Sequence, residues 1–325
     1  MQENMLKEIG IMEVGGFQVG HAQDYEGMTG CTVILCDRQS PAGVDIRGGG
    51  PASRETPLLT PVQDAAGIHA LLLSGGSAFG LDAAGGVMKY LEERDIGFDV
   101  GVTKVPLVTQ SCVFDLQIGD VYCRPDQKMG YAACENASYA PMEEGCVGAG
   151  TGCTVGKYRG RDLAMKTGIG SFAVQVGDLK VGAIVAVNAL GDVYDIETGK
   201  ELAGLRNEAG EMISTELEMW KDIDAMAGLA KQNTTIGAIL TNAKMDKTLM
   251  NKVASMAHNG YARTIRPVHT TADGDTIYAL SLGDLKSDVN LVGTLAAYVM
   301  GKAINRAVLS AKSMCGLPAA GDYSA

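Results

Sequence analysis

The chain has 325 residues, a formal net charge of −11 and a hydrophobic fraction of 46%. This length and hydrophobic content predict one α/β domain, 1–325, with a large buried core. The acidic balance argues against nucleic acid and anionic membrane surfaces as partners, because both are bound through basic patches. No stretch of 18 apolar residues runs without a charge or a glycine, so no membrane span is predicted.

Eight cysteines occur in the chain, and no two of them are spaced as C-x-x-C. An even number is compatible with disulfides in a secreted protein. However, residues 1–8 contain neither the basic nor the apolar region of a signal peptide. Several cysteines also border apolar runs, as Cys31 and Cys36 do. We therefore expect buried free thiols and a reducing, cytoplasmic location.

Potential metal ligands are not grouped in the sequence. His21, His69, His258 and His269 are scattered, and no cluster of histidines, cysteines or carboxylates has ligand spacing. We expect no metal and no other cofactor, so activity should survive EDTA. Loss of activity in EDTA, with recovery on adding one metal, would contradict this expectation.

The first part of the chain, up to about residue 97, predicts short strands and one helix. The strands are expected at 16–20, 30–36 and 69–73. The helix follows the S-G-G-S turn at 74–77, is capped by the first or last serine of that turn, and continues to about Arg94. The glycine run 48–50 should bring backbone amides close to another strand or to an anionic group. The G-x-S-x-G motif of a hydrolase elbow and the nucleotide P-loop motif are both absent.

No element is predicted with any precision between residues 99 and 135, where polar turns alternate with short apolar pieces. The next segment, 145–157, is rich in glycine and other small residues and ends at Lys157. A lysine in such a segment is either an ordinary surface residue or a buried one. If buried, it needs a carboxylate or carbonyl partner.

A β-hairpin is predicted from 170–177 and 181–188, with its turn at Gly177-Asp178. The second strand is apolar until it reaches Asn188. A side-chain amide at the end of a buried strand is a candidate donor to an oxyanion. Asn188 is equally compatible with a turn residue before Gly191-Asp192.

The last third of the chain is predicted to alternate polar connections with regular elements. Residues 198–232 are polar, with a short helix at 213–220. The later predicted elements are a buried strand at 235–241, a helix at 245–258 ending at Asn259-Gly260, a strand at 262–265 and a long helix from 287 to about 312.

Asp273-Gly274-Asp275 enters a further strand. A plain turn accounts for this tripeptide. Alternatively, the two carboxylates face one site, where one orients an amine and the other holds its partner. The remaining ligand positions of a calcium loop are missing.

The junction Asn233-Thr234 stands just before the strand at 235–241. One interpretation is a turn followed by a strand. The other is a self-cleaving junction, in which the Thr234 hydroxyl attacks the Asn233 carbonyl and water releases a new amino terminus. Thr234 would then carry a hydroxyl and a free amine, and an amine with a reference pKa of about 7.7–8 can accept the hydroxyl proton near neutral pH.

The chain resembles the L-aminopeptidase/D-esterase family of self-processing hydrolases with an N-terminal nucleophile, which includes β-peptidyl aminopeptidases and nylon-oligomer hydrolases. The resemblance extends from Gly20-His21 through the turn at 74–77 to the terminal helix. Its most specific parts are Asn233-Thr234 and the Thr-x-x-Asp-Gly-Asp-Thr segment at 270–276. A threonine at the junction is closer to the nylon-hydrolase branch than to the aminopeptidase branch, where serine stands.

This resemblance implies two β-sheets sandwiched between helix layers, cleaved into fragments 1–233 and 234–325, and a homotetramer of processed protomers. It implies Thr234 as nucleophile, with Lys157 and Asn188 lining the site and Asp273 and Asp275 completing it. Asn188 would suit an oxyanion donor, while the lysine and the aspartates would tune and position the Thr234 amine. The substrate would be a small peptide or amide.

Three functions are compatible with the sequence. The favoured one is a self-processed amidohydrolase or aminopeptidase. The second is an acyltransferase of the ornithine-acetyltransferase type, in which an amine replaces water as acceptor. The third is a non-catalytic binding or assembly protein that keeps the fold. A denaturing gel separates the third from the others, because a binding protein has no need to cleave itself.

Overall fold

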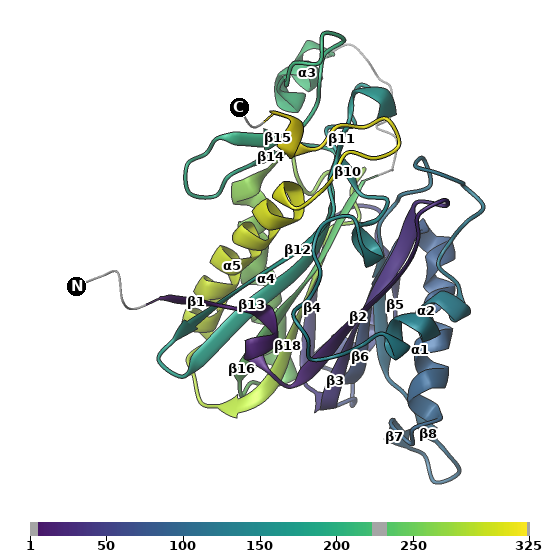
Figure 1. Cartoon of the computed structure of the whole chain (residues 1–325). Coiled ribbons are helices and arrows are strands. Elements are labelled where there is room, and N and C mark those ends of the chain that lie inside the picture. The colour runs from purple at the N-terminus through teal and green to yellow at the C-terminus, as the bar shows by residue number, and fades with distance from the viewer. Residues whose placement is uncertain (1–5, 223–232, 324–325) are drawn as a thin grey trace.

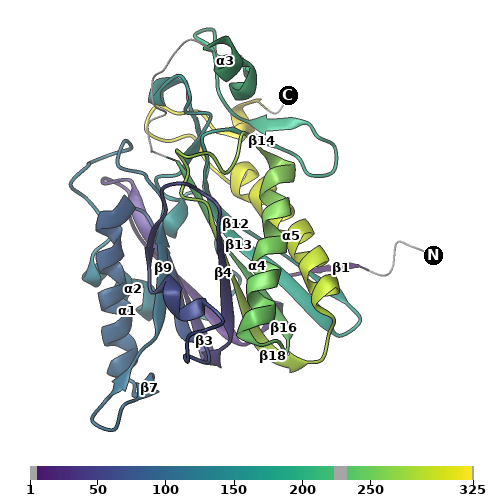
Figure 2. The same ribbon diagram turned by 180° about the vertical axis from the view of Figure 1, so that it is seen from behind.

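The structure, a computed structural model, describes residues 6–222 and 233–323. Two β-sheets face each other, and helices cover the outer face of each sheet, as Figure 1 shows and Figure 2 shows from behind. The layers therefore run helix, sheet, sheet, helix. This arrangement confirms the predicted α/β sandwich.

The strand after the junction lies inside a six-stranded sheet. Its order is β1 (Lys7–Ile9), β12 (Ile169–Val176), β13 (Leu179–Asn188), β16 (Thr234–Ala243), β18 (Thr276–Leu285) and β4 (Ala42–Ile46). β16 pairs antiparallel with β13 and parallel with β18. The predicted hairpin at 170–188 and the predicted strand at 235–241 are both confirmed.

The facing sheet has five strands, and all of them come from the N-terminal part of the chain. Its order is β2 (Phe17–Asp24), β3 (Thr29–Ser40), β6 (Ile68–Ser74), β9 (Val108–Cys112) and β5 (Ala52–Arg54). The three predicted strands correspond to β2, β3 and β6. β2 and β3 extend beyond the predicted bounds, because their pairing continues over polar residues as far as Asp24 and Thr29.

Helices α4 (Lys247–Thr264) and α5 (Val289–Leu309) cover the six-stranded sheet, and α1 (Ala83–Glu92) and α2 (Gln127–Glu135) cover the five-stranded one (Figure 1). The short helix α3 (Thr215–Lys221) confirms the helix predicted at 213–220. The remaining strands form small sheets: β7 (Phe98–Asp99) with β8 (Lys104–Val105), β10 (Thr154–Val155) with β11 (Met165–Lys166), and β14 (Asp192–Tyr194) with β15 (Glu201–Ala203) and β17 (Ile265–Arg266).

Alternating side chains of β16 enter two different cores. Ile236, Ala238 and Leu240 pack between the two sheets. Ile239 and Ala243 pack on the other side, against α4 and α5. Because side chains alternate along a strand, Thr234 faces the space between the sheets. This alternation is what directs the candidate nucleophile into the sandwich.

The predicted end of α4 at His258 is wrong, and so is the strand predicted at 262–265. The helix runs through Asn259-Gly260 to Thr264. Gly260 is needed for helix packing, because a Cβ there would lie 2.6 Å from the Ala297 carbonyl oxygen of α5. A glycine that lets two helices approach closely has the same local sequence as one that ends a helix.

Three further differences lie outside α4. Between the predicted turn and α1 the chain forms a 3₁₀ turn at Ser77–Asp82, because Gly76 and Ser77 both have positive φ. The N-cap of α1 is therefore Asp82 and neither serine. Residues 99–135, for which no element was predicted, contain β9 and α2. The polar segment 198–232 contains β15 and α3, and its residues 223–232 lie outside the described chain.

The cysteines form no disulfide in the described chain, where all eight are free and six are buried. This agrees with the expectation of buried thiols. None of the helices in residues 6–222 and 233–323 has the length and apolar character needed to cross a bilayer.

Candidate active site

Thr234 begins β16, and its hydroxyl donates a hydrogen bond to the carbonyl oxygen of Asn233. Both residues are buried, with 4% of Thr234 and 3% of Asn233 exposed. The hydroxyl therefore lies against the carbonyl group that it would attack in self-cleavage.

The same carbonyl oxygen has a second donor. The backbone N–H of Gly274 donates to the Asn233 oxygen at 2.9 Å, within a parallel bridge that joins Asn233 to Asp273. A backbone N–H aimed at a carbonyl polarises it and stabilises the negative oxygen that forms on attack. Sequence analysis missed this donor, because its role depends on the pairing of two segments that are distant in the chain.

A side chain at position 274 would disturb this geometry. A Cβ there would lie 2.8 Å from the Thr234 hydroxyl oxygen. We expect Gly274→Ala to slow cleavage at the junction by about tenfold or more, which corresponds to at least ~1.4 kcal/mol in the barrier. Gly50→Ala is the matched control, since its Cβ would meet only the Asp273 oxygen, at 3.8 Å. Equal cleavage by both variants on a denaturing gel would contradict this role.

Asp275 holds the residue that follows the nucleophile. Its Oδ1 accepts the Thr235 backbone N–H at 2.8 Å, and its Oδ2 accepts the backbone N–H and the ring Nδ1 of His269 at 3.1 and 2.9 Å. The carboxylate is buried and has a hydrogen-bond donor at each oxygen. His269 is a site residue that sequence analysis did not find, because no motif connects a histidine to an aspartate six positions later.

Asp273 has a more local environment. Its Oδ2 accepts the backbone N–H and the hydroxyl of Thr270, at 2.7 and 2.6 Å. Burial, helped by the charge of Asp275, raises the pKa of Asp273 to about 6. The two carboxylates are therefore close enough to interact, as the sequence interpretation of a shared site required.

The glycine run 48–50 supports this aspartate turn. Gly48 and Gly50 donate backbone N–H groups to the carbonyl oxygens of Asp275 and Asp273, at 3.2 and 2.8 Å. A Cβ on Gly48 would lie 2.3 Å from the Asp275 nitrogen, so only glycine permits this approach. The sequence predicted that these amides would lie close either to another strand or to an anionic group. In the structure they bond to the backbone of another segment, the aspartate turn.

Asn188 stands directly opposite Thr234 in the ladder between β13 and β16, so both side chains project from the same face of the sheet. Its Oδ1 accepts the Thr154 backbone N–H at 3.0 Å and the Lys157 ammonium at 2.9 Å, and these donors fix the orientation of the amide. Its Nδ2 donates to the Phe114 carbonyl oxygen at 2.8 Å. Within the described chain, the second Nδ2 hydrogen remains for another acceptor.

Lys157 is held by carbonyl groups and is not a simple surface lysine. Its Nζ donates to the backbone oxygen and to the Oδ1 of Asn188, both at 2.9 Å. Burial lowers the pKa of Lys157 to about 7, although Asp273 and Asp275 act in the opposite direction. An amine with this pKa changes its protonation state near neutral pH, which is what a general base requires.

All five predicted site residues thus converge at the start of β16. Lys157 bonds to Asn188, and Asn188 lies opposite Thr234. Asp273 pairs with Asn233 in a β-bridge, and Asp275 accepts the backbone N–H of Thr235. In the part of the chain that the structure describes, no three histidine, cysteine or acidic side chains are grouped as a metal site.

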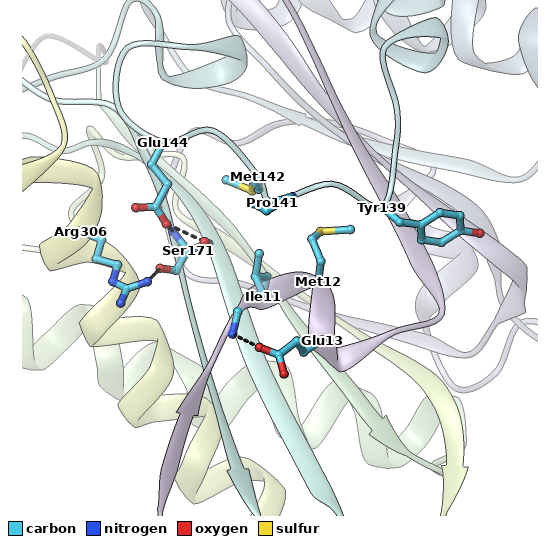
Figure 3. Close-up of a pocket in the computed structure, with 10 residues that line it drawn as sticks. Ile11, Met12, Glu13, Tyr139, Pro141, Met142, Glu144, Ser171 and Arg306 are labelled. Carbon is cyan, nitrogen blue, oxygen red and sulfur yellow. Dashed lines mark hydrogen bonds between the residues drawn. The ribbon is translucent and has the colours of Figure 1, made fainter.

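A pocket of about 630 Å³, which none of these site residues lines, lies between residues 10–13, the segment 139–144, β12 and α5 (Figure 3). Its charged side chains already have partners. Glu13 accepts a hydrogen bond from the Gly10 N–H, and Glu144 accepts one from the Ser171 N–H at 2.9 Å. Arg306 donates to the backbone carbonyl oxygen of Ser171. The pocket therefore contributes no group to the junction chemistry.

Comparison with known proteins covers the core and the site together. The profile of Peptidase family S58 matches residues 10–320. An uncharacterized aminopeptidase of Mycobacterium leprae is 36% identical over 347 residues, spanning 95% of this chain and 92% of that protein. A 6-aminohexanoate-oligomer endohydrolase of Kocuria sp. is 30% identical over 310 residues, spanning 89% of this chain and 83% of that protein.

Solved structures share the fold, among them an L-aminopeptidase D-Ala-esterase/amidase from Ochrobactrum anthropi, which is described as a new variant among the Ntn hydrolase fold. It superposes with a TM-score of 0.72 at 17% identity, over 95% of this chain and 88% of that one. Because the profile spans residues 10–320 and the Mycobacterium leprae relative is 36% identical over 95% of the chain, the chain belongs to Peptidase family S58.

Proposed function

We propose that this member of the family is a self-processing amidohydrolase or aminopeptidase whose nucleophile is Thr234. Family membership makes the chain a peptidase or amidohydrolase. The observation that carries the finer proposal is the contact of the Thr234 hydroxyl with the Asn233 carbonyl oxygen, which also accepts the Gly274 N–H. The proposal includes cleavage into 1–233 and 234–325, and a cytoplasmic homotetramer.

Self-cleavage would proceed through an ester. The Thr234 oxygen forms a bond to the Asn233 carbonyl carbon while its proton passes to a base, and the Gly274 N–H stabilises the negative oxygen. The bond from Asn233 to the Thr234 nitrogen then breaks, and that nitrogen takes up a proton. Water hydrolyses the resulting ester, which gives an Asn233 carboxylate and leaves Thr234 with its hydroxyl and a free α-amine.

Turnover would use the same residues. The α-amine accepts the hydroxyl proton of Thr234 as the oxygen attacks a substrate amide. The second Nδ2 hydrogen of Asn188 is the candidate donor to the oxyanion, because Asn188 lies opposite Thr234. The amine product then leaves, and water releases the acid. The Kocuria relative is named for hydrolysis of 6-aminohexanoate oligomers, which supports a small amide or peptide as substrate.

Incubation of the purified chain at neutral pH tests the proposal. We expect the full-length band on a denaturing gel to be replaced by a large and a small band, whose masses match fragments 1–233 and 234–325. The fragments should stay associated in a native gel, because β16 of the small fragment is hydrogen-bonded to β13 of the large one. A single full-length band after prolonged incubation would count against self-processing.

The pH dependence of cleavage tests Lys157. The precursor has no free amine at Thr234, so a side chain must take the hydroxyl proton, and Lys157 has a pKa of about 7. Its neutral fraction rises about tenfold between pH 6 and pH 8. We expect the cleavage rate to rise with pH over this interval and to level off above it. Asp273, with a pKa of about 6, titrates at the lower end.

Lys157→Arg is the control for this pH prediction. Arginine keeps a positive charge and N–H donors but has no neutral form near pH 7. Cleavage by this variant should fall by about a hundredfold or more, as expected on losing a general base. A wild-type rate that does not change between pH 6 and pH 8, or an active arginine variant, would remove Lys157 from this role.

A further inference from the structure

Two donors of His269 converge on one carboxylate oxygen. The backbone N–H and the ring Nδ1 both bond to Oδ2 of Asp275, which leaves Oδ1 for the Thr235 N–H. The Asp275 side chain is 2% exposed and that of His269 is 17% exposed. Thus Thr235 is connected to His269 through a single buried carboxylate.

The Asp275 carboxylate determines which nitrogen of the His269 ring donates to it. Because Oδ2 accepts, Nδ1 of His269 carries a proton. Nε2 of His269 is buried and has no hydrogen-bond partner in the described chain, and the same is true of Nδ1 of His258. The other ring nitrogen of His258, Nε2, bonds to the Asp45 carbonyl oxygen at 3.0 Å. The two rings meet edge to face with centroids 4.7 Å apart, and Tyr261 stacks on His269 at 5.9 Å.

This packing fixes the plane of the His269 ring, and the ring fixes the Asp275 carboxylate. We infer that His269 is a positioning residue for the nucleophile: through Asp275 it holds the Thr235 N–H, and so sets where Thr234 lies against the Asn233 carbonyl. The inference rests on the proposed function for its catalytic consequence. The geometric part, from His269 to the Thr235 amide, is testable without any catalysis.

The backbone at position 269 provides a clean test. His269 has a φ of 60°, a left-handed conformation that glycine and asparagine adopt readily. His269→Gly keeps the backbone N–H and deletes the ring donor. His269→Asn also loses the ring, but its side-chain NH₂ replaces Nδ1–H as a donor to Asp275. The two variants share the loss of packing against Tyr261 and His258, so their difference reports the donor.

The first measurement is hydrogen exchange of the Thr235 amide by NMR, in a Thr234→Ala precursor that cannot cleave. We expect His269→Gly to accelerate this exchange by about tenfold or more and His269→Asn to keep it within about threefold of the parent. Equal exchange in the two variants would overturn the positioning role, whatever the protein does catalytically.

The second measurement is the rate of junction cleavage with Thr234 restored. We expect His269→Gly to lose about ten- to a hundredfold and His269→Asn to recover most of that loss, because a misplaced nucleophile lowers the rate steeply. Tyr261→Phe keeps the stacked ring and should cleave like the parent. If the parent cleaves and the glycine variant matches it, the inference fails. If the exchange results are as expected but the parent never cleaves, the proposed function fails and the positioning role stands.

Discussion

Thr234→Ala should leave the chain as one 33.9 kDa polypeptide with no amidase activity. The variant lacks the hydroxyl that contacts the Asn233 carbonyl oxygen, so neither the junction nor a substrate amide can be attacked. The fold should survive, because the change deletes one hydroxyl and one methyl group, at a cost of about 1–3 kcal/mol. A denaturing gel, an amide hydrolysis assay and a thermal melt check the three parts of this expectation.

Thr235→Ala is the matched control for that experiment. Thr235 is also fully buried, but its side chain points to the opposite face of β16, and its bond to Asp275 uses the backbone N–H. Its cleavage rate should stay within about threefold of the parent. Thr234→Ser keeps a hydroxyl and should process more slowly. A Thr234→Ala chain that still cleaves and hydrolyses amides would end the assignment of Thr234.

Asp275→Asn should have the second largest effect, with self-cleavage and turnover both falling by about 30- to 1,000-fold, equivalent to ~2–4 kcal/mol. The carboxylate accepts from Thr235 on one oxygen and from two N–H groups of His269 on the other. An amide has one acceptor oxygen, so its NH₂ group faces a donor in either orientation, and leaving a buried donor unpaired costs about 1–3 kcal/mol.

Cleavage kinetics and kcat for an amide substrate measure this effect. Asp178→Asn, an exposed aspartate in the turn between β12 and β13, is the control and should behave like the parent. Asp273→Asn should reduce turnover less, because that carboxylate accepts from Thr270 within its own turn. An Asp275→Asn chain that cleaves at the parent rate would show that the carboxylate has no part in placing Thr234.

Local patterns in the sequence predicted the elements whose signals are strong. The apolar hairpin and the apolar α5 were found near their true bounds, because periodicity reports burial directly. The end of α4 was predicted wrongly, because Gly260 allows close packing against Ala297 of α5 and does not end the helix. The local sequence contains no information about that neighbouring helix. α2 was missed for a related reason: its apolar side is narrow, and burial against the five-stranded sheet stabilises it.

In the candidate site, too, some residues were predicted from the sequence, while others depend on contacts between distant segments. The resemblance to a known family supplied Thr234, Asn188 and Lys157, and register brings them together, since Asn188 pairs with Thr234 and bonds Lys157. Gly274 contacts the Asn233 carbonyl oxygen through its backbone N–H, and His269 contacts the Asp275 carboxylate through its ring Nδ1. Neither interaction has a sequence pattern, because each depends on how the turn at 269–275 lies against the junction.

The N-terminal residue of the small fragment tests the central claim most directly. Edman sequencing, or the intact mass of the fragment released from the purified chain, identifies the bond that breaks. The account predicts a fragment that begins Thr234-Thr235-Ile236, with a large fragment ending at Asn233. A fragment that begins at any other residue would contradict the assignment of Thr234 as nucleophile and, with it, the proposed mechanism.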